Sequence, residues 1–522
     1  MTRPRETERD DAPFEGGGLR QLAAAGAVGP HRARVWLRSP YSGRHRLVIR
    51  ALGAVESVAT VDLVVDEAAD RTGATTVGDT IDALTPNTNY SVDVLVPGRD
   101  ALLAQCRFRT TPTGAHDTPG RVAIAVMSCH QPFDDAGEVD ARATCLLDDA
   151  SEILAREDVS RVIMMGDQVY TDLPKSRSLF DAEHFATVAP AGRADLLACT
   201  REEIRRLLHA RYRAFWSPTG MRALQSGWAS DLILDDHEIV DNFGSAPEHA
   251  TPRFGALRAG ALDAYYDYQA SRTLRLVDGH RPASFHRCWR HGSIATFVMD
   301  LRSERRRRND RIEVYADAQH RALARFLEDS RACHVVMLGL SVPLLHVPDW
   351  IADLGVLLGG EGSDAADRWS YQAANECRDR LLELLRRHQR DNPAQRIVLM
   401  GGDIHVGLAS RMMWSDEMDT RDADGCIFQV VSSAISNRYS PLMQQLASLA
   451  PRSRALVGRS GDAIAFGELM PGTVEAKTNP CGDLNLAIIE VWRESAKRSK
   501  LRFKLYGHGG QRPHLAFDSG LV

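Results

Sequence analysis

Residues 121–170 read RVAIAVMSCHQPFDDAGEVDARATCLLDDASEILAREDVSRVIMMGDQVY and carry the pattern that decides the fold. Two continuous apolar runs, RVAIAVMS (121–128) and VSRVIMMG (159–166), predict strands that are buried on both faces. The segment between them, ATCLLDDASEILAR (143–156), has apolar residues at helical spacing. A strand, a helix and a second strand in this order indicate a layered α/β architecture.

The same alternation continues toward the C-terminus. Further apolar runs of the buried-strand kind are ASDLILD (229–235), IATFVMD (294–300), CHVVMLGL (333–340), QRIVLMG (395–401) and IFQVVSS (427–433). Helical patterns lie between several of them, namely EEIRRLLHARYRAFW (202–216), AQHRALARFLED (318–329) and CRDRLLELLRRHQ (377–389). Near the C-terminus, DLNLAIIEVWRE (483–494) and KLRFKLYG (500–507) predict a hairpin that closes a sheet.

The N-terminal part has a different pattern, in which short segments alternate apolar and polar residues. The candidate strands are ARVWLR, HRLVIRAL, ATVDLVV, NYSVDVLV and LLAQCRFR, bounded by Gly, Pro, Asn and Asp as in a sandwich of short strands. Leu84, Pro86 and Tyr90 form a run that is similar to the tyrosine corner of immunoglobulin and fibronectin type III domains. A chance tyrosine in an edge strand is the alternative.

These patterns divide the chain. We expect a disordered tail at 1–18, a β-sandwich domain at 19–112, a linker rich in Gly, Pro and Thr at 113–120, and a second domain at 121–522. A length of 522 residues agrees with at least two domains.

The composition is that of an ordinary globular protein. Hydrophobic residues make up 44% and charged residues 25%, and the net charge of −5 argues against a generally basic nucleic-acid binder. The first residues contain no apolar signal-peptide core and no stretch is long enough for a membrane helix, so we expect a cytoplasmic protein without a membrane span. Nine cysteines without CxxC pairs suggest reduced thiols.

Polar residues follow the predicted buried strands, where open α/β sheets place their ligands. They are Cys129 and His130, then Asp167 and Tyr170, then Asp235, Asp236, His237, Glu238, Asp241 and Asn242, then Asp300 and Arg302, and finally Asp403 and His405. A single strand-end aspartate such as Asp235 often only caps a helix. Several carboxylates at one edge repel one another and raise each other's pKa unless a cation neutralises them. The set therefore predicts a metal centre.

The residue types point to two different ions. Carboxylate oxygens favour hard cations, whereas Cys and His favour softer or transition metals, so a mixed set suggests two sites that share a bridging carboxylate. Two ions about 3.5–4 Å apart form such a centre in many hydrolases of phosphate esters. A phenol such as Tyr170 has a pKa near 10 and becomes a ligand only beside a strongly acidic ion such as ferric iron. Alone, Tyr170 would more often be an interfacial tyrosine.

Three motifs at strand ends carry a family resemblance. GDQVYTD (166–172), LDDHEIVDNFG (234–244) and GGDIHVG (401–407), in this order after SCHQ (128–131), resemble the PhoD-like phosphatases, also called the alkaline phosphatase D family. The resemblance spans roughly residues 105–440. It implies an Ig- or fibronectin-like β-sandwich, followed by a calcineurin-like α/β metallophosphatase sandwich of two sheets flanked by helices.

The resemblance also implies a set of ligands. A ferric ion would be held by Cys129, Asp167, Tyr170 and His405 beside a calcium ion, although other divalent metals remain open. Asp167 would bridge the two ions, and Asp403 would bind calcium together with a residue of the DDHEIVDN segment. Asp236 is one candidate for that last ligand, and Asp241 or Asn242 is another, since family members often have Asn at this place.

The predicted reaction is hydrolysis of phosphodiesters or monoesters by in-line attack of a metal-bound hydroxide. His237 would protonate the leaving group, and Arg302 and His130 would contact the substrate. An ordinary hydrogen-bonded histidine, and a salt bridge from Arg302 to Asp300, are the structural alternatives. Two alternative functions are open. One is a non-catalytic metal- or phosphate-binding protein of the same fold, and the other is a structural or adhesive protein in which the β-sandwich is the functional part.

Overall fold

The computed structural model describes residues 14, 18–78, 84–99, 101–416, 427–438, 453–458, 461–471, 479–495, 498–509, 513 and 515–518. Most of the predicted tail at 1–18 therefore lies outside the described residues. No helix in the described ranges is long and apolar enough to cross a membrane. No disulfide bond joins the cysteines of the described part of the chain.

The N-terminal strands form two small sheets. One sheet has the order β1-β2-β5, with β1 at Leu22–Gly26, β2 at Ala33–Arg38 and β5 at Thr72–Val77. The other has the order β4-β3-β6-β7, with β3 at Gly43–Ala51, β4 at Ala59–Val65, β6 at Asn89–Leu95 and β7 at Leu102–Arg109. The five predicted strands are confirmed, and β1 and β5 were missed. Tyr90 accepts a hydrogen bond from the Thr85 N–H at 2.8 Å, as in a tyrosine corner, while the Ig-like assignment stays a prediction.

Two larger sheets form the rest of the chain. The six-stranded sheet has the order β10-β9-β8-β21-β22-β23, with β8 at Arg121–Met127, β9 at Val159–Met164, β10 at Ser230–Leu232, β21 at Leu486–Arg493, β22 at Ser499–Tyr506 and β23 at Leu515–Asp518. The predicted C-terminal hairpin is confirmed, because β21 and β22 pair antiparallel and β21 continues the sheet beside β8.

The eight-stranded sheet has the order β11-β12-β15-β16-β18-β17-β20-β19. Its strands are β11 at Arg287–His291, β12 at Ile294–Val298, β15 at Val335–Gly339, β16 at Arg396–Gly401, β17 at Leu408–Trp414, β18 at Ile427–Val431, β19 at Ser453–Val457 and β20 at Ala463–Leu469. A separate two-stranded sheet joins β13 at Arg306–Arg308 to β14 at Arg311–Glu313.

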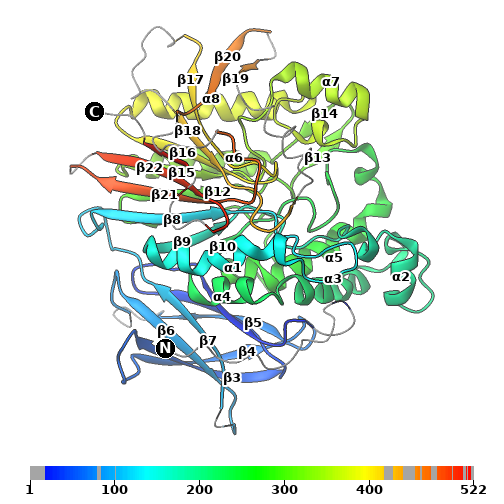
Figure 1. The fold of residues 1–522 in the computed structure, drawn as a ribbon, viewed down its shortest axis with the longest axis vertical. Coiled ribbons are helices and arrows are strands. Elements are labelled where there is room, and N and C mark those ends of the chain that lie inside the picture. Colours follow the sequence, from blue (N-terminus) through cyan, green and yellow to red (C-terminus); the bar gives the residue numbers. More distant parts are fainter. Residues whose placement is uncertain are drawn as a thin grey trace.

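Helices cover the outer faces of the six-stranded and the eight-stranded sheets (Figure 1). They are α1 at Ala141–Arg156, α2 at Ala182–Val188, α3 at Arg201–Phe215, α4 at Thr219–Gly227, α5 at Pro252–Tyr268, α6 at Asp317–Asp329, α7 at Asp349–Gly359 and α8 at Asn375–Asp391. Short 3-10 helices are η1 at Lys175–Arg177, η2 at Leu196–Ala198, η3 at Pro247–Ala250, η4 at Ala270–Arg272, η5 at Asp364–Asp367 and η6 at Gln372–Ala374.

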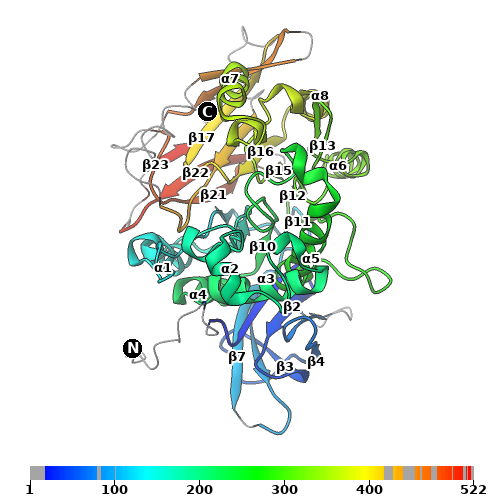
Figure 2. The same ribbon diagram turned by 90° about the vertical axis from the view of Figure 1, so that its right-hand side faces the viewer.

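Burial on both faces explains the apolar runs. In β8, Ile124 and Val126 belong to a core cluster that also contains Val298, Met337 and Val398 of the other sheet. Ala125 and Met127, which point to the opposite face, pack in a second cluster with residues of α1, α3 and α5. A third cluster joins α6 and α8 to the eight-stranded sheet. The layers are therefore helices, sheet, sheet and helices, and the two views agree with this order (Figures 1 and 2).

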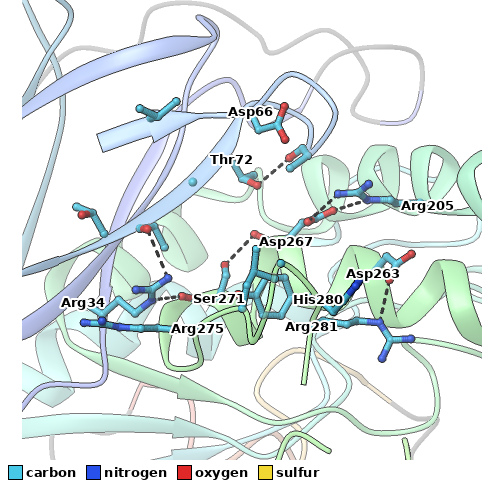
Figure 3. A pocket seen from close by; sticks show the side chains of 18 of the residues that line it. Arg34, Asp66, Thr72, Arg205, Asp263, Asp267, Ser271, Arg275, His280 and Arg281 are labelled. Carbon is cyan, nitrogen blue, oxygen red and sulfur yellow. Dashed lines mark hydrogen bonds and ion pairs between the residues drawn. The ribbon is translucent and has the colours of Figure 1, made fainter. Parts of the chain in front are cut away.

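The N-terminal sheets lie against the helices of the first layer (Figure 2). Between β5 and helices α3 and α5 is a cavity of about 700 Å³. Arg34 of β2 donates to the Ser271 carbonyl oxygen at 2.5 Å, and Arg205 pairs with Asp267 through hydrogen bonds of 2.7 and 3.0 Å (Figure 3). The Arg34 contact thus joins the two parts of the chain, whereas Arg205 and Asp267 join α3 to α5. The strand-end residues do not line this cavity.

Glu490 in β21 forms ion pairs with neighbouring strands of the six-stranded sheet. Its carboxylate accepts from Arg121 Nε at 3.0 Å and from Lys504 Nζ at 2.7 Å. Burial opposes ionisation, but the hydrogen bonds from Lys504 and Arg121 lower the pKa of Glu490 to about 2. An acid with a depressed pKa stabilises the fold above its unfolded pKa, near 4.5, and this contribution is lost as the pH falls toward 2.

We expect Glu490→Gln to lower the free energy of unfolding at pH 7 by about 2 kcal/mol, because the ion pairs with Arg121 and Lys504 are lost. The loss is limited, because these partners are partly exposed and solvent screens the pairs. The difference from the wild type should shrink between pH 4.5 and 2 in chemical unfolding experiments. Glu494→Gln is the control, since Glu494 forms a more exposed pair with Lys500 at 2.8 Å. Equal stability of the Glu490→Gln and wild-type proteins at pH 7 would contradict this account.

Candidate metal centre

Four strands deliver the candidate residues to one edge. In the six-stranded sheet, Met164 of β9 pairs in parallel with Met127 of β8 and with Leu232 of β10, so the three strands end at the same level. The segments that follow carry Cys129, Asp167 and the Asp235–Glu238 run, and β16 of the other sheet leads into Asp403. The predicted convergence of polar strand ends is therefore what the fold produces.

Two groups of side chains could hold a cation. One consists of Asp167, Asp236 and His237, and the other of Asp167, Asp235, Asp236 and Asp403. Within each group the potential ligand atoms lie within 4.8 Å of one another. Asp167 and Asp236 belong to both groups, so the two groups are parts of one cluster centred on these carboxylates.

Cys129 and Tyr170 adjoin the same side of Asp167. The Cys129 Sγ atom lies 3.3 Å from Asp167 Oδ2, and the Tyr170 hydroxyl lies 3.5 Å from that oxygen. Asn437 donates to the Tyr170 hydroxyl at 3.3 Å, and the Tyr170 ring stacks at 6.1 Å on Phe215. A thiol, a phenol and a carboxylate thus meet at one point of the site.

The two sheets are tied together at this edge by Ser433, which follows β18. The His405 N–H donates to Ser433 Oγ at 2.9 Å, and the Ser433 hydroxyl lies 3.1 Å from Cys129 Sγ. His405 is 9% exposed, and its pKa is lowered to about 3 by burial and by the neighbouring His237 and Arg368. A neutral imidazole is the form that binds metal ions.

The backbone at these positions is unusual. Cys129, Asp167, Asp403 and His405 have φ angles of 57°, 56°, 64° and 52°, in the left-handed region that residues other than glycine rarely adopt. Such conformations cost about 1–3 kcal/mol each and persist where the surroundings impose them, typically at functional sites. Four of them among the predicted ligands indicate that the strand ends are shaped for the site.

Glu238 fixes two of these strand ends to each other. Its carboxylate accepts the backbone N–H groups of Asp167 at 3.1 Å, Gln168 at 2.8 Å and Asp235 at 3.0 Å. Gln269 donates to it at 3.1 Å. Glu238 therefore positions Asp167 and Asp235, and it does not belong to either group of potential ligands.

The electrostatics of the site favour a cation. Burial raises the pKa of the Cys129 thiol to about 12, and burial together with Cys129 and Asp236 raises the pKa of Asp167 well above its usual range. Asp167 Oδ1, Asp235 Oδ2 and Asp236 Oδ1 are buried and have no hydrogen-bond partner within the described residues. Because buried polar atoms are normally satisfied, such oxygens in one cluster fit the coordination of metal ions.

The structure separates the alternatives for the last ligand. Asp236 is buried and lies in both groups, with its Oδ2 accepting the Asn242 N–H at 2.6 Å. The side chain of Asp241 is 53% exposed and belongs to neither group. The Asn242 amide donates instead to Asp364 Oδ1 at 3.1 Å. Asp236 is thus the best placed of the three.

His237 is held in a defined orientation. Its Nδ1 lies 2.8 and 3.0 Å from the two carboxylate oxygens of Asp172, and its ring lies 4.3 Å from the Tyr170 ring. Its Nε2 is 3.7 Å from Asp241 Oδ1. The side chain is 14% exposed, so solvent reaches part of the ring. Asp172, which is 65 positions away in the sequence, was not predicted as its partner.

Two residues expected to contact the substrate lie elsewhere. His130 is fully buried, with Nδ1 2.6 Å from Ser436 Oγ and Nε2 2.6 Å from the Phe215 carbonyl oxygen. Arg302 is also fully buried and donates to Asp235 and to both oxygens of Asp367. Their hydrogen-bonding groups are directed into the protein, so this geometry does not favour direct substrate contact by either.

The salt-bridge alternative for Arg302 had named the wrong partner. Asp300 accepts the backbone N–H groups of Phe285 at 2.8 Å and Ser303 at 2.8 Å, as a local capping residue. Asp235, weighed as a helix cap from its sequence, is a member of the carboxylate cluster. Arg368 was not predicted from the sequence, and it forms an ion pair with Asp403.

Fold and site together define a layered α/β protein with a buried acidic cluster suited to metal ions. The sequence matches the PhoD-like phosphatase family model over residues 124–469, and the chain belongs to this family. This membership supports a phosphoesterase that binds metal ions, and it does not favour the non-catalytic alternative.

Comparison with solved structures agrees on the fold. The structure of PhoD is similar with a TM-score of 0.65 and 14% identity, covering 99% of this chain and 90% of that chain. The FN5 domain of Drosophila Lar has a TM-score of 0.14 and 17% identity, covering 18% of this chain and 96% of that chain. No curated protein matches the sequence.

Proposed function

We propose that this protein hydrolyses phosphate esters, diesters or monoesters, at the strand-end site with two cations bound. The observation that carries the proposal is the group of four carboxylates, from Asp167, Asp235, Asp236 and Asp403, whose potential ligand atoms lie within 4.8 Å of one another. Two ions held there would supply Lewis acidity and lower the pKa of a water molecule. The domain division at residues 19–112 and 121–522, the calcineurin-like description and the cytoplasmic location remain predictions.

The donor set supports unlike ions. Cys129, Tyr170 and His405, with Asp167, offer the sulfur, phenolate and imidazole donors that suit ferric iron, whereas Asp236 and Asp403 offer the oxygen donors that suit calcium. Asp167 would bridge the two ions. Cys129 and His405 belong to neither group of potential ligands, so this assignment of iron and calcium rests on ligand chemistry and on the family resemblance.

The protein's own groups account for the remaining steps. A water molecule gives one proton to solvent, and the resulting hydroxide oxygen attacks phosphorus in line with the leaving oxygen, so one P–O bond forms while the other breaks. His237 donates the proton on Nε2 to the leaving oxygen, while Asp172 holds Nδ1–H at 2.8 Å and keeps the ring in place. His237 is a catalytic residue in this scheme, and Asp172 is a positioning residue.

Metal analysis coupled to kinetics tests the proposal. Purified protein should contain stoichiometric metal, absorb visible light if a ferric phenolate or thiolate is present, and hydrolyse bis(p-nitrophenyl) phosphate or p-nitrophenyl phosphate. A chelator should abolish both metal and hydrolysis, and the returned ions should restore them. Full hydrolysis by the metal-free protein would exclude this mechanism.

His237→Asn gives a sharper test of proton donation. We expect a fall in kcat of about 100-fold for an alkyl phosphate ester, whose leaving oxygen needs the proton, and a small effect for the p-nitrophenyl ester. His508→Gln is the control, since His508 pairs with Asp149 at an exposed site. An equal loss for both esters would assign His237 a role other than donation to the leaving group.

A further inference from the structure

Arg368 stands at the solvent-facing side of the carboxylate cluster. It follows η5 directly, and its Nη1 forms an ion pair with Asp403 Oδ2. The side chains of Arg368 and Asp403 are 12% and 11% exposed, whereas that of Arg302 is fully buried. Of these two arginines, only Arg368 combines contact with the cluster and access to solvent.

Both neighbours of Arg368 in the chain are anchored. Asp367 accepts from Arg302 Nη1 at 2.7 Å and lies 3.0 Å from Arg305 Nη2. Trp369 is buried and its Nε1 donates to the Val342 carbonyl oxygen at 3.0 Å. Because the residues on either side are fixed, the Arg368 backbone has a defined position beside Asp403.

The same segment is joined to the predicted ligands. Asn242 donates through its side chain to Asp364 Oδ1 at 3.1 Å, and its backbone N–H donates to Asp236 Oδ2 at 2.6 Å. Arg302 connects Asp367 to Asp235. The segment that carries Arg368 is therefore linked to two carboxylates of the cluster, to Asp236 through Asn242 and to Asp235 through Arg302.

We propose that Arg368 binds the phosphoryl oxygens of the substrate, and that Asp367, gripped by Arg302 and Arg305, positions it. This inference rests on the proposed function, since it concerns the same site. A guanidinium offers a planar fork of N–H donors that matches two oxygens of a phosphoryl group. A cation bound at Asp403 would share the charge of that carboxylate and would weaken the ion pair, so that guanidinium N–H groups could donate to an incoming anion.

The role of Arg302 follows from this assignment. Burial opposes ionisation of Asp367, but Arg302 and Arg305 hold the pKa of Asp367 well below its usual range, so the carboxylate stays charged. Because Asp367 is charged and pairs with both Arg302 and Arg305, the residue that directly precedes Arg368 has a fixed position. Arg302 therefore acts on the substrate through Asp367 and Arg368, as a positioning residue.

Binding of inorganic phosphate to the metal-loaded protein tests the proposal by calorimetry. We expect Arg368→Gln to weaken phosphate binding by about 10- to 100-fold with unchanged metal content, because charge-assisted hydrogen bonds are lost. Arg368→Lys should recover part of the phosphate affinity lost in Arg368→Gln, since lysine restores the positive charge but not the planar set of N–H donors. Arg308→Gln is the matched control, because Arg308 is 64% exposed and pairs with Glu313 in the separate two-stranded sheet.

A double-substitution cycle tests the positioning role. Asp367→Asn should weaken phosphate binding, and Asp367→Asn combined with Arg368→Gln should bind no more weakly than Arg368→Gln alone. Additive losses would show that Asp367 acts independently of Arg368. The Arg368 variants decide the main proposal by themselves if Asp367→Asn does not fold.

Wild-type phosphate affinity in Arg368→Gln with full metal content would overturn the inference and leave the proposed hydrolysis intact. The inference would also fail if Arg368→Gln lowered the melting temperature of the loaded and metal-free proteins equally, since Arg368 would then be a permanent partner of Asp403. Failure of the proposed function has a different signature, because the metal-loaded wild-type protein would then hydrolyse no ester, or the metal-free protein would hydrolyse esters at the full rate.

Discussion

Asp167→Asn is expected to lose its bridging metal and to hydrolyse aryl phosphodiesters more than roughly 100-fold more slowly than the wild type. Asp167 belongs to both groups of potential ligands and adjoins Cys129 Sγ at 3.3 Å. An amide removes one negative charge and one of the two oxygen donors at the centre of the site. Metal content by mass spectrometry and steady-state kinetics measure the two effects, and His405→Ala should behave similarly.

The same substitution should stabilise the metal-free protein. Burial and the neighbouring Cys129 and Asp236 raise the pKa of Asp167, so its ionised form costs folding free energy at neutral pH. Replacing the carboxyl group by an amide removes that cost, and the gain should vanish below about pH 4, where the carboxyl is protonated in both states. A higher melting temperature without metal, together with lost hydrolysis, would separate a defect in the site from a defect in folding.

Neighbouring carboxylates supply the controls for this prediction. Asp236→Asn should also reduce metal content, because Asp236 lies in both groups, whereas Asp241→Asn should retain both ions. Normal metal content and rate in Asp167→Asn would remove the metal mechanism. Loss of metal in Asp241→Asn with retention in Asp236→Asn would return the last ligand to Asp241.

The sequence predicted the site well where local pattern determines position. A strand buried on both faces reads as an apolar run, and the residue after it must lie at the edge of the sheet, as Cys129 and Asp167 do. The left-handed backbone at these residues has no comparable signal in the sequence, since the surroundings impose it. The edge could therefore be predicted, and the orientation of each side chain could not.

Long-range pairing explains the residues that were misassigned. Arg302 and Asp367 are 65 positions apart, and nothing near either residue marks them as partners. His130 follows the same strand as Cys129, yet Ser436 and Phe215, which are distant in the sequence, turn it into the core. Whether a polar side chain beside a site faces the ligand or the core depends on such contacts.

Arg302→Met is expected to lower the free energy of unfolding by about 3–5 kcal/mol, because it removes the guanidinium paired with two buried carboxylates, of which Asp367 keeps Arg305 as a partner. Asp235 and Asp367 are both at most 1% exposed, and both are paired with Arg302. Chemical unfolding of the metal-free protein measures the loss. Arg308→Met is the control, since Arg308 is 64% exposed and its replacement should change stability by less than about 0.5 kcal/mol.

The pH dependence identifies the cause of that loss. Asp367 has a depressed pKa in the folded protein, so its pairing stabilises the fold above the unfolded pKa, near 3.8, and this contribution fades at lower pH. The gap between the wild type and Arg302→Met should therefore be widest at neutral pH and narrow below about pH 4. A gap that does not change with pH would attribute the loss to packing of the arginine side chain. Arg302→Lys retains the positive charge but lacks the planar set of N–H donors of a guanidinium. An intermediate free energy of unfolding would show that the charge and the donor geometry both contribute.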